Sequence, residues 1–481
     1  MSNANRDEIA LAEAPPASGG GSGLALAVIA VAQLMLVFDA TILNIALPSI
    51  QADFNVAPAD LTWLVTIYAL VFGGLLLVGG RAGDLYGRRR VFRIGLVVFT
   101  LASLLGGLAQ NETTLVVARA LQGVGAAIAA PTALALIFTT FTDETSRNKA
   151  LGIYGGMGGL GSTVGLLLGG VLTEYAHWRW VLLINVPLAV LVLVGTTVLA
   201  EGDRERGRMD IPGAVTATLG LTALVYAINR AGTEGWTDAL TLGCFAAGAV
   251  LLVAFLAIQR SSPVAMMPLR IIRDSNRAGA NLILFLVGVA MFAMFYFLTL
   301  YMQGVKGYSA MATGVAYLPF AVAVGLSAGA LGPQLLKRLS VKVVTAIGLA
   351  FTAAGLVWFS QMSATSSYTT VLLPGMVVTG IGLGQVFVAT TIAGVAGVRD
   401  EDTGVASGLV NISQEVGGAL GLAVLATIAA KVTADATLPD SVTDGYSVAF
   451  LTGAVMIAAA IVIALLTIKA KAEDAKPIPG L

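Results

Sequence analysis

The chain has 481 residues, of which 57% are hydrophobic and only 11% are charged, and its mean hydropathy is +0.88. Soluble globular proteins carry about 25% charged residues, so this composition excludes an ordinary soluble fold and favours a membrane protein. Lysine plus arginine balances aspartate plus glutamate at 27 each, which leaves no basic surplus for nucleic acid. The single Cys244 excludes an intramolecular disulfide, and the lone His177 excludes a histidine metal cluster.

Residues 1–23 are polar and rich in Gly and Ser after Pro15-Pro16, which predicts a disordered cytoplasmic tail rather than a signal peptide. Fourteen apolar stretches of roughly 20 residues follow, and they predict an all-α polytopic membrane protein. The expected spans are 24–47, 61–80, 91–109, 114–138, 150–172, 180–200, 211–229, 239–259, 278–303, 312–333, 341–360, 370–396, 404–430 and 446–468.

Basic residues set the expected orientation, because cytoplasmic loops are enriched in Lys and Arg. With the N-terminus inside, twenty-two of the 27 basic residues fall on inside segments and four on outside segments, while Arg119 lies within a span. We therefore expect both termini, including the short tail 469–481, to lie in the cytoplasm.

Two polar segments, 201–210 and 260–277, flank the seventh and eighth spans. Without that central pair, two six-span halves remain, and the loop 332–338 takes the place in the second half that the Arg-rich loop 80–90 takes in the first. Duplicated halves around a midplane site are a common build of secondary transporters. The expected division is a half at 24–200, a linker with two extra helices at 201–260, and a half at 261–468.

Several motifs carry a family resemblance that covers almost the whole chain. They are the Gly/Asp/Arg loop 80–90, the run Asp39–Pro48 in span 1, Arg119 with Gln122, Gly123 and Gly125 in span 4, the span 5 glycines, and Trp178-Arg179-Trp180 with Asn185 and Pro187 before span 6. The chain resembles the major facilitator superfamily, specifically the fourteen-span drug:H+ antiporter family 2 of the EmrB/QacA type. It departs from the antiporter motif at Leu166, where relatives carry proline, and at Gln414, where they often carry a basic residue.

The resemblance implies a proton-coupled exporter of hydrophobic or cationic drugs that works by alternating access in a bacterial cytoplasmic membrane. It implies protons as the coupling ion and no other cofactor. The expected partners are a small-molecule substrate and membrane lipid, with no nucleic acid, and the expected state is a monomer.

Asp39 and Arg119 are the first candidates for proton coupling. Asp39 lies about 22 Å along span 1, and Arg119 is only a few residues into span 4 from the outer side, so their depths match. A carboxylate within a span is costly and suggests function by default. Protonation and substrate binding would then compete for one carboxylate. The alternative is an ion pair that only holds the first half together.

Glu415 is the third candidate for proton coupling, about 16 Å into span 13 and close to the midplane. No cationic partner is evident within the spans of the second half, so the acid should be neutral or face water. It would attract a cationic drug or carry a second proton. The alternative is a neutral glutamic acid hydrogen-bonded between helices.

Two further groups of residues have expected conformational roles. The loop residues Gly80, Asp84, Gly87, Arg88 and Arg89 are expected to form an inner gate, with Asp84 near a helix N-terminus of the other half; the alternative is that they serve topology alone. The span 5 glycines, Gly161, Gly165, Gly169 and Gly170, permit close helix contact and are expected to form a pivot between the halves, or else ordinary packing.

Polar, aromatic and methionine side chains at depth are the candidates for the substrate cavity. Methionines repack readily around varied ligands, and aromatic rings can hold cations. The candidates are Asn44, Tyr68, Gln122, Met291, Phe295, Tyr296 and Asn411. Core packing, lipid contact or satisfied interhelical hydrogen bonds would explain the same residues.

Other functions compete with drug export. An exporter of one metabolite, self-made antibiotic or lipid fits the same sequence, and so does a non-transporting membrane sensor. A membrane enzyme is disfavoured, because the chain has no Gly-x-x-x-x-Gly-Lys-Ser/Thr phosphate loop and no His-Glu-x-x-His metal motif.

Overall fold

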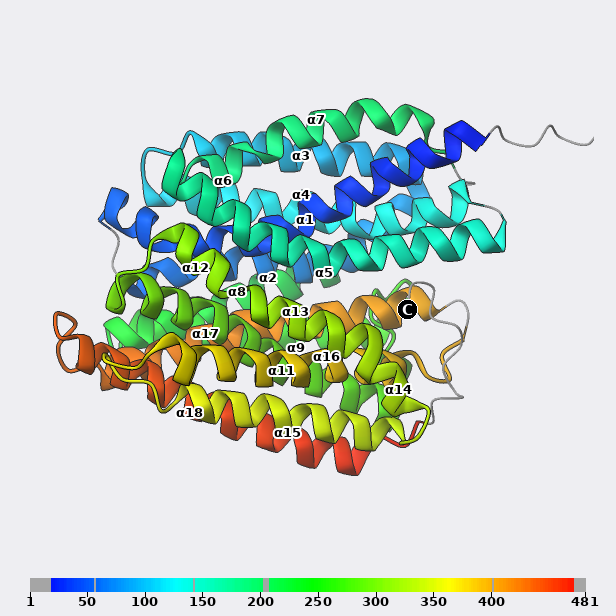
Figure 1. Ribbon diagram of the computed structural model, residues 1–481. Coiled ribbons are helices and arrows are strands. Elements are labelled where there is room, and N and C mark those ends of the chain that lie inside the picture. The colour runs from blue at the N-terminus through cyan, green and yellow to red at the C-terminus, as the bar shows by residue number, and fades with distance from the viewer. Residues whose placement is uncertain (1–18, 56–57, 142, 202–206, 400–401, 471–481) are drawn as a thin grey trace, which may run out of the picture.

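The computed structural model describes residues 19–55, 58–141, 143–201, 207–399 and 402–470 (Figure 1). Most of the two predicted tails lies outside these residues. Arg204 and Arg206, which contribute to the predicted inside charge, lie outside them as well.

The described residues contain 14 helices long and apolar enough to cross a membrane, which confirms the predicted all-α fold with fourteen spans. The first six spans are built from α1 (Gly19–Phe54), α2 (Pro58–Tyr86), α3 (Arg88–Gly107), α4 (Glu112–Thr140), α5 (Glu144–Tyr175), and the trio α6 (Trp180–Leu183), α7 (Asn185–Gly195) and η1 (Thr196–Val198). The central pair is α8 (Ile211–Thr233) and α9 (Ala239–Ser261).

The short helix α10 (Leu269–Ile272) leads into the last six spans. These are α11 (Ser275–Leu300) with η2 (Tyr301–Val305); α12 (Ala310–Ala316), α13 (Leu318–Leu326), η3 (Ser327–Leu331) and α14 (Gly332–Leu336); α15 (Val341–Phe359); η4 (Tyr368–Leu372) with α16 (Leu373–Val395); α17 (Thr403–Val432); and α18 (Pro439–Thr467).

Four expected spans are divided into shorter helical pieces, and prolines explain where in three of them. Pro187, Pro319, Pro333 and Pro374 each lie within the first three residues of the helix that follows a break. A proline has no N–H to donate and its ring clashes with the carbonyl four residues earlier, which favours a break in the preceding turn, although α1 and α4 continue through Pro48 and Pro131. The stretches η3 and η4, which precede Pro333 and Pro374, are accordingly π-helical.

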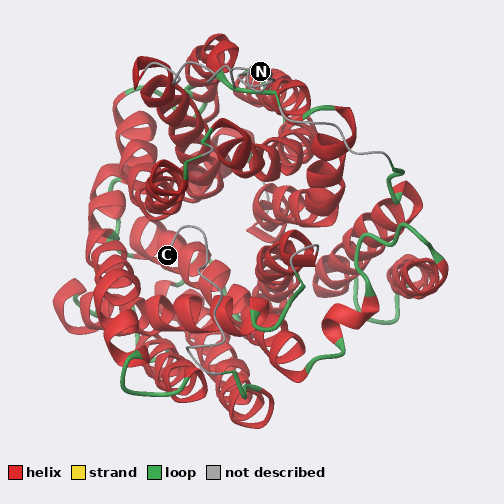
Figure 2. Ribbon diagram, turned by 90° about the vertical axis from the view of Figure 1, so that its right-hand side faces the viewer, coloured by secondary structure: helices red, strands yellow, loops and turns green. Residues whose placement is uncertain are grey.

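The spans pack as two bundles. In the first bundle α1 packs on α5, α2 on α4 and α3 on α4; in the second, α11 packs on α17, α15 on α16 and α15 on α18. Helix α1 begins and helix α18 ends at the right-hand end of Figure 1, and Figure 2 looks onto that end. We call it the termini end and the opposite end the far end.

The bundles meet along two seams. On one, α5 packs against α12 and α13; on the other, α2 packs against α17. The central helix α8 lies along the second seam, because it contacts both α2 and α17, whereas α9 packs chiefly against α8. Val225 of α8 packs in one cluster with Ala69 of α2 and Ala419 of α17, so this helix is bound to both bundles.

Candidate functional site

Asp39 and Arg119 form a buried ion pair in the first bundle. Arg119 Nη1 donates to Asp39 Oδ2 over 2.8 Å, and the side chains are 2% and 0% exposed. The sequence predicted this pairing from matching depths in the first and fourth spans. Breaking a buried pair by removing one partner typically costs about 3–5 kcal/mol, so neither charge can be lost without a response from its neighbours.

Three further polar side chains complete the network around the pair. Gln122 Nε2 donates to Asp39 Oδ1 over 3.1 Å, and Asn185 Nδ2 donates to the same oxygen over 2.6 Å. Gln122 Oε1 accepts from Arg119, and Gln122 Nε2 also donates to Ser103 Oγ. The carboxylate of Asp39 is therefore held by donors from α4 and α7 at once.

Arg119 is held from two more directions by α2. Its Nε donates to the Leu64 carbonyl over 3.1 Å, and its guanidinium lies over the Tyr68 ring, 4.4 Å from the centroid. A cation over an aromatic face is favourable, most of all where water is excluded. Tyr68 is itself 5% exposed and stacked on Phe72. The predicted cavity residue Tyr68 thus supports the ion pair directly.

The network contains two residues that the site prediction did not include, Asn185 and Ser103. In the sequence, Asn185 is noted only as part of a motif that carries the family resemblance, with no role assigned to it. Nothing in the sequence points to Ser103. Asn185 Oδ1 is buried with no hydrogen-bond partner among the described residues. An orphaned buried oxygen is costly, and here its amide is oriented by the bond that its nitrogen makes to Asp39.

The change Asn185→Ala is expected to lower the free energy of unfolding by about 1–3 kcal/mol, because it removes a donor from a buried carboxylate. Thermal unfolding of the purified protein measures this. Thr100→Ala is the control, since the Thr100 hydroxyl donates only to Leu96 of its own helix. Equal melting temperatures for the two variants would show that Asn185 does not support Asp39.

Glu415 does not join this network. It lies on α17 at the seam with α2, where a Cβ added to Gly73 would stand 3.5 Å from the Glu415 Cβ. The side chain is half-buried, and within the described part of the chain its carboxylate has no hydrogen-bond partner. Of these two candidate acids, Asp39 has a basic partner among the described residues and Glu415 has none.

The other cavity candidates divide into three groups. Gln122 belongs to the ion-pair network, and Asn44 donates to carbonyls of its own helix. Phe295 is 6% exposed and packs edge-on against Phe320 within the second bundle. Met291, whose sulfur lies 3.9 Å from Gln414 Nε2, is half-buried and Asn411 is exposed.

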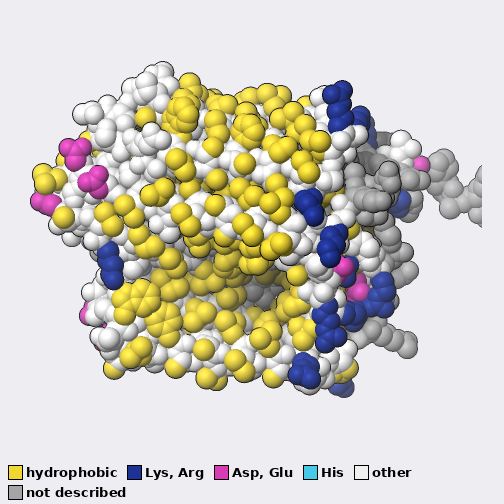
Figure 3. Space-filling model, turned by 90° about the horizontal axis from the view of Figure 1, so that it is seen from below, with side chains coloured by type: hydrophobic (Ala, Val, Ile, Leu, Met, Phe, Trp, Pro, Cys, Tyr) yellow, Lys and Arg dark blue, Asp and Glu magenta, His cyan; other side chains and the backbone are white. Residues whose placement is uncertain are grey.

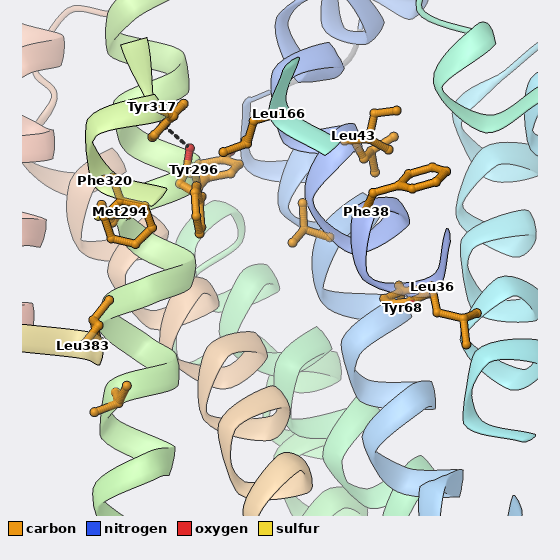
Figure 4. Packing of buried hydrophobic residues seen from close by; sticks show 14 of the residues in the cluster. Leu36, Phe38, Leu43, Tyr68, Leu166, Met294, Tyr296, Tyr317, Phe320 and Leu383 are labelled. Carbon is orange, nitrogen blue, oxygen red and sulfur yellow. Dashed lines mark hydrogen bonds between the residues drawn. The ribbon is translucent and has the colours of Figure 1, made fainter. Parts of the chain in front are cut away.

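Tyr296 lies where the second bundle faces the first. It is 3% exposed. Figure 4 shows it on the second bundle with Tyr317 and Phe320, while Phe38 and Tyr68 lie on the first and Leu166 of α5 reaches toward the Tyr296 side. Tyr296 is thus placed at the surface between the bundles, whereas Phe297 packs against Tyr446 and Phe450 of α18 within the second bundle.

The Arg-rich loop is a sharp turn between α2 and α3. Gly87 adopts a φ of 101°, a conformation that side chains with a Cβ rarely take, and Gly80 packs against Pro131 of α4. Arg88 donates to Asp84 over 3.1 Å, and Arg89 pairs with Glu201 over 3.6 Å. In this structure these bonds stay within the first bundle, so the predicted gate contact of Asp84 with the other half remains a prediction.

The span 5 glycines do not share one partner. A Cβ added to Gly161, Gly165 or Gly169 would press against Val37, Phe38 or Ile42 of α1, all within the first bundle. A Cβ added to Gly170 would instead lie 2.8 Å from the Ala310 carbonyl oxygen of α12. Gly170 is the member of this set that brings the two bundles together.

Comparisons with known proteins agree with this architecture. The family model described as Major Facilitator Superfamily matches residues 29–422. The puromycin resistance protein of Streptomyces alboniger is 40% identical over 93% of this chain and 92% of its own length, and the cephamycin export protein of Amycolatopsis lactamdurans is 39% identical over 92% and 91%.

Among solved structures, a bacterial homologue of the human lysosomal transporter Spinster superposes with a TM-score of 0.70 at 15% identity, covering 96% of this chain and 100% of that one. The shared fold and the sequence matches together show that this chain, a multi-pass membrane protein, belongs to the major facilitator superfamily.

Proposed function

We propose that the chain is a secondary transporter that exports hydrophobic, often cationic small molecules in exchange for protons. The observation that carries the proposal is the fully buried Asp39–Arg119 pair, whose carboxylate is held by donors from separate helices. A membrane-embedded ionisable pair is costly and typical of proton relays. The relatives named for puromycin resistance and cephamycin export support a small-molecule cargo.

The proposed coupling follows from the charges in the network. A proton that binds Asp39 neutralises the partner of Arg119 and weakens the bonds that tie α1 to Gln122 of α4 and to Asn185 of α7. We propose that this weakening lets α1 shift relative to α4 and α7, while Arg119 keeps its bond to Gln122. When Asp39 loses the proton, its ion pair with Arg119 forms again. Asp39 therefore binds and releases one proton in each transport cycle.

The proposed orientation places the termini end in the cytoplasm. On the face shown in Figure 3, most Lys and Arg side chains gather at that end, together with some Asp and Glu side chains, whereas acidic side chains predominate over basic ones at the far end. This matches the positive-inside rule. We place the chain in the bacterial cytoplasmic membrane as a monomer, with halves at 24–200 and 261–468 and the extra pair within 201–260.

The proposal needs no resident cofactor and no metal, since protons serve as the coupling ion. It also needs no enzymatic step. Glu415 supplies a second acid that faces the seam between the halves, where it would attract a cationic substrate or carry a second proton.

Ethidium extrusion from cells that express the chain tests the proposal. We expect energised cells to extrude ethidium, and we expect extrusion to stop when a protonophore is added or when Asp39 is replaced by Asn. Asp444→Asn, which alters an exposed carboxylate on α18, is the matched control and should extrude normally. Extrusion by Asp39→Asn with unchanged proton dependence would refute the coupling scheme.

A second candidate function is export of one specific compound, such as an antibiotic made by the same cell. It is favoured by the relatives, because two of them are named for single compounds, puromycin and cephamycin. Cells that express the chain should then fail to extrude ethidium but should extrude one compound from a panel of antibiotics. If the protein is folded in the membrane and yet extrudes no ethidium, the result favours export of one specific compound over export of many drugs.

A further inference from the structure

The two ends of the seam between α5 and α12–α13 differ in how closely the bundles approach. At the far end, a Cβ added to Gly170 or Gly314 would collide with the backbone of the opposite bundle. Toward the termini end, a Cβ on Gly152 or Gly156 of α5 would meet open space. The same holds for Gly325 of α13 and Gly329 of η3. On this seam the bundles are therefore in close backbone contact at the far end, whereas these four glycines toward the termini end have space beside them.

A carboxylate lies at the closed end, one turn beyond Gly170. Glu174 Oε2 accepts a hydrogen bond from the Met311 N–H over 2.8 Å. Met311 is in the first turn of α12, where backbone N–H groups have no carbonyl partner within their own helix. The bond therefore joins the end of α5 to the start of α12 across the two bundles, and a charged acceptor makes it stronger than a neutral one.

A second bond crosses the bundles nearby. Gln303 Nε2 donates to the Ile45 carbonyl of α1 over 2.9 Å. Gln303 lies in the π-helical stretch η2, which ends the span of α11. Such π-helical turns interrupt the regular ladder and occur often at functional positions. This one places a side-chain amide of the second bundle against a carbonyl of the first.

We propose that these two bonds, Glu174 to Met311 and Gln303 to Ile45, form a far-end latch that holds the transporter closed on that side. The latch rests on the proposed alternating access, in which the far end opens when the termini end closes. Both bonds then break together, because each joins one bundle to the other. Glu174 and Gln303 are positioning residues: they set the balance between the two states.

The latch predicts how a thiol below it reacts. Leu166 is 2% exposed on α5, and its carbonyl oxygen would lie 2.6 Å from a Cβ on Gly314, so a cysteine at position 166 reports opening of the far end. In a Cys244→Ser, Leu166→Cys protein, we expect Glu174→Ala or Gln303→Ala to speed labelling by a water-soluble maleimide about fivefold to tenfold each, since each removes a hydrogen bond worth about 1 kcal/mol or more.

The double variant should label faster than either single one. Glu174→Gln should label nearly as slowly as the parent, because it keeps an acceptor oxygen, and Asp444→Ala, which removes an exposed carboxylate on α18, should leave the rate unchanged. Unfolding curves confirm that the variants are folded. Parental labelling rates in the folded double variant would overturn the latch.

Labelling needs neither substrate nor a proton gradient, so it separates this inference from the proposed function. Faster labelling in a protein that fails to extrude any compound would support the latch and refute the export function. If the parent protein exports ethidium but the double variant labels no faster than the parent, the latch is refuted and the proposed export function is not.

Discussion

Replacing Asp39 with Asn is expected to abolish proton-driven export and also to destabilise the protein. The change leaves the Arg119 guanidinium, which is 2% exposed, without its counter-charge. Removing one partner of a buried ion pair costs about 3–5 kcal/mol. Thermal unfolding in detergent and ethidium extrusion from cells measure the two effects side by side.

A double variant decides whether the pair is functional or only structural. Asp39→Asn with Arg119→Gln removes both charges, so we expect it to regain much of the stability that the single variant loses. Export should nevertheless stay absent, because the buried carboxylate to which the proposal assigns the proton is then missing. If export returned together with stability, the pair would be a structural brace, as the alternative from the sequence holds.

Adding one methyl group at Gly170 is expected to slow export strongly. The Cβ of Gly170→Ala would lie 2.8 Å from the Ala310 carbonyl oxygen and 2.9 Å from the Met311 Cα, so the far end could close only with strain. Overpacking of this kind costs about 1–3 kcal/mol, which disfavours the closed far end by about fivefold to more than a hundredfold.

Gly243→Ala on α9 is the control, because its Cβ would meet open space on a helix that packs chiefly against α8 and not on the seam between α5 and α12. We expect its export rate and its unfolding curve to equal those of the parent. Initial rates of ethidium extrusion compare the two variants. Equal rates for Gly170→Ala and Gly243→Ala would mean that close approach at the far end is not part of the transport cycle.

The span count and the main ion pair were predictable from sequence, for a physical reason. A bilayer demands about 20 apolar residues for each crossing, and a charge inside such a run is rare enough to be noticed. Asp39 and Arg119 therefore stood out, and equal depth was enough to pair them. Their predicted pairing is confirmed by the 2.8 Å contact between them.

The contacts between the bundles were not predictable in the same way. The four glycines of span 5 look equivalent in the sequence, yet three face α1 and only Gly170 faces α12. Glu174 and Gln303 lie near span ends, where polar residues are common and carry no signal. Asn185 and Ser103 are ordinary polar residues until the fold brings them to Asp39 and Gln122.

The most direct test of the account is proton movement in proteoliposomes that contain the purified chain. Ethidium is added on one side without an imposed proton gradient, and the internal pH is followed with a fluorescent dye. We predict an ethidium-dependent pH change with the parent protein and none with Asp39→Asn. Ethidium uptake that occurs without any pH change, or an equal pH change with Asp39→Asn, would contradict the proposed exchange at this carboxylate.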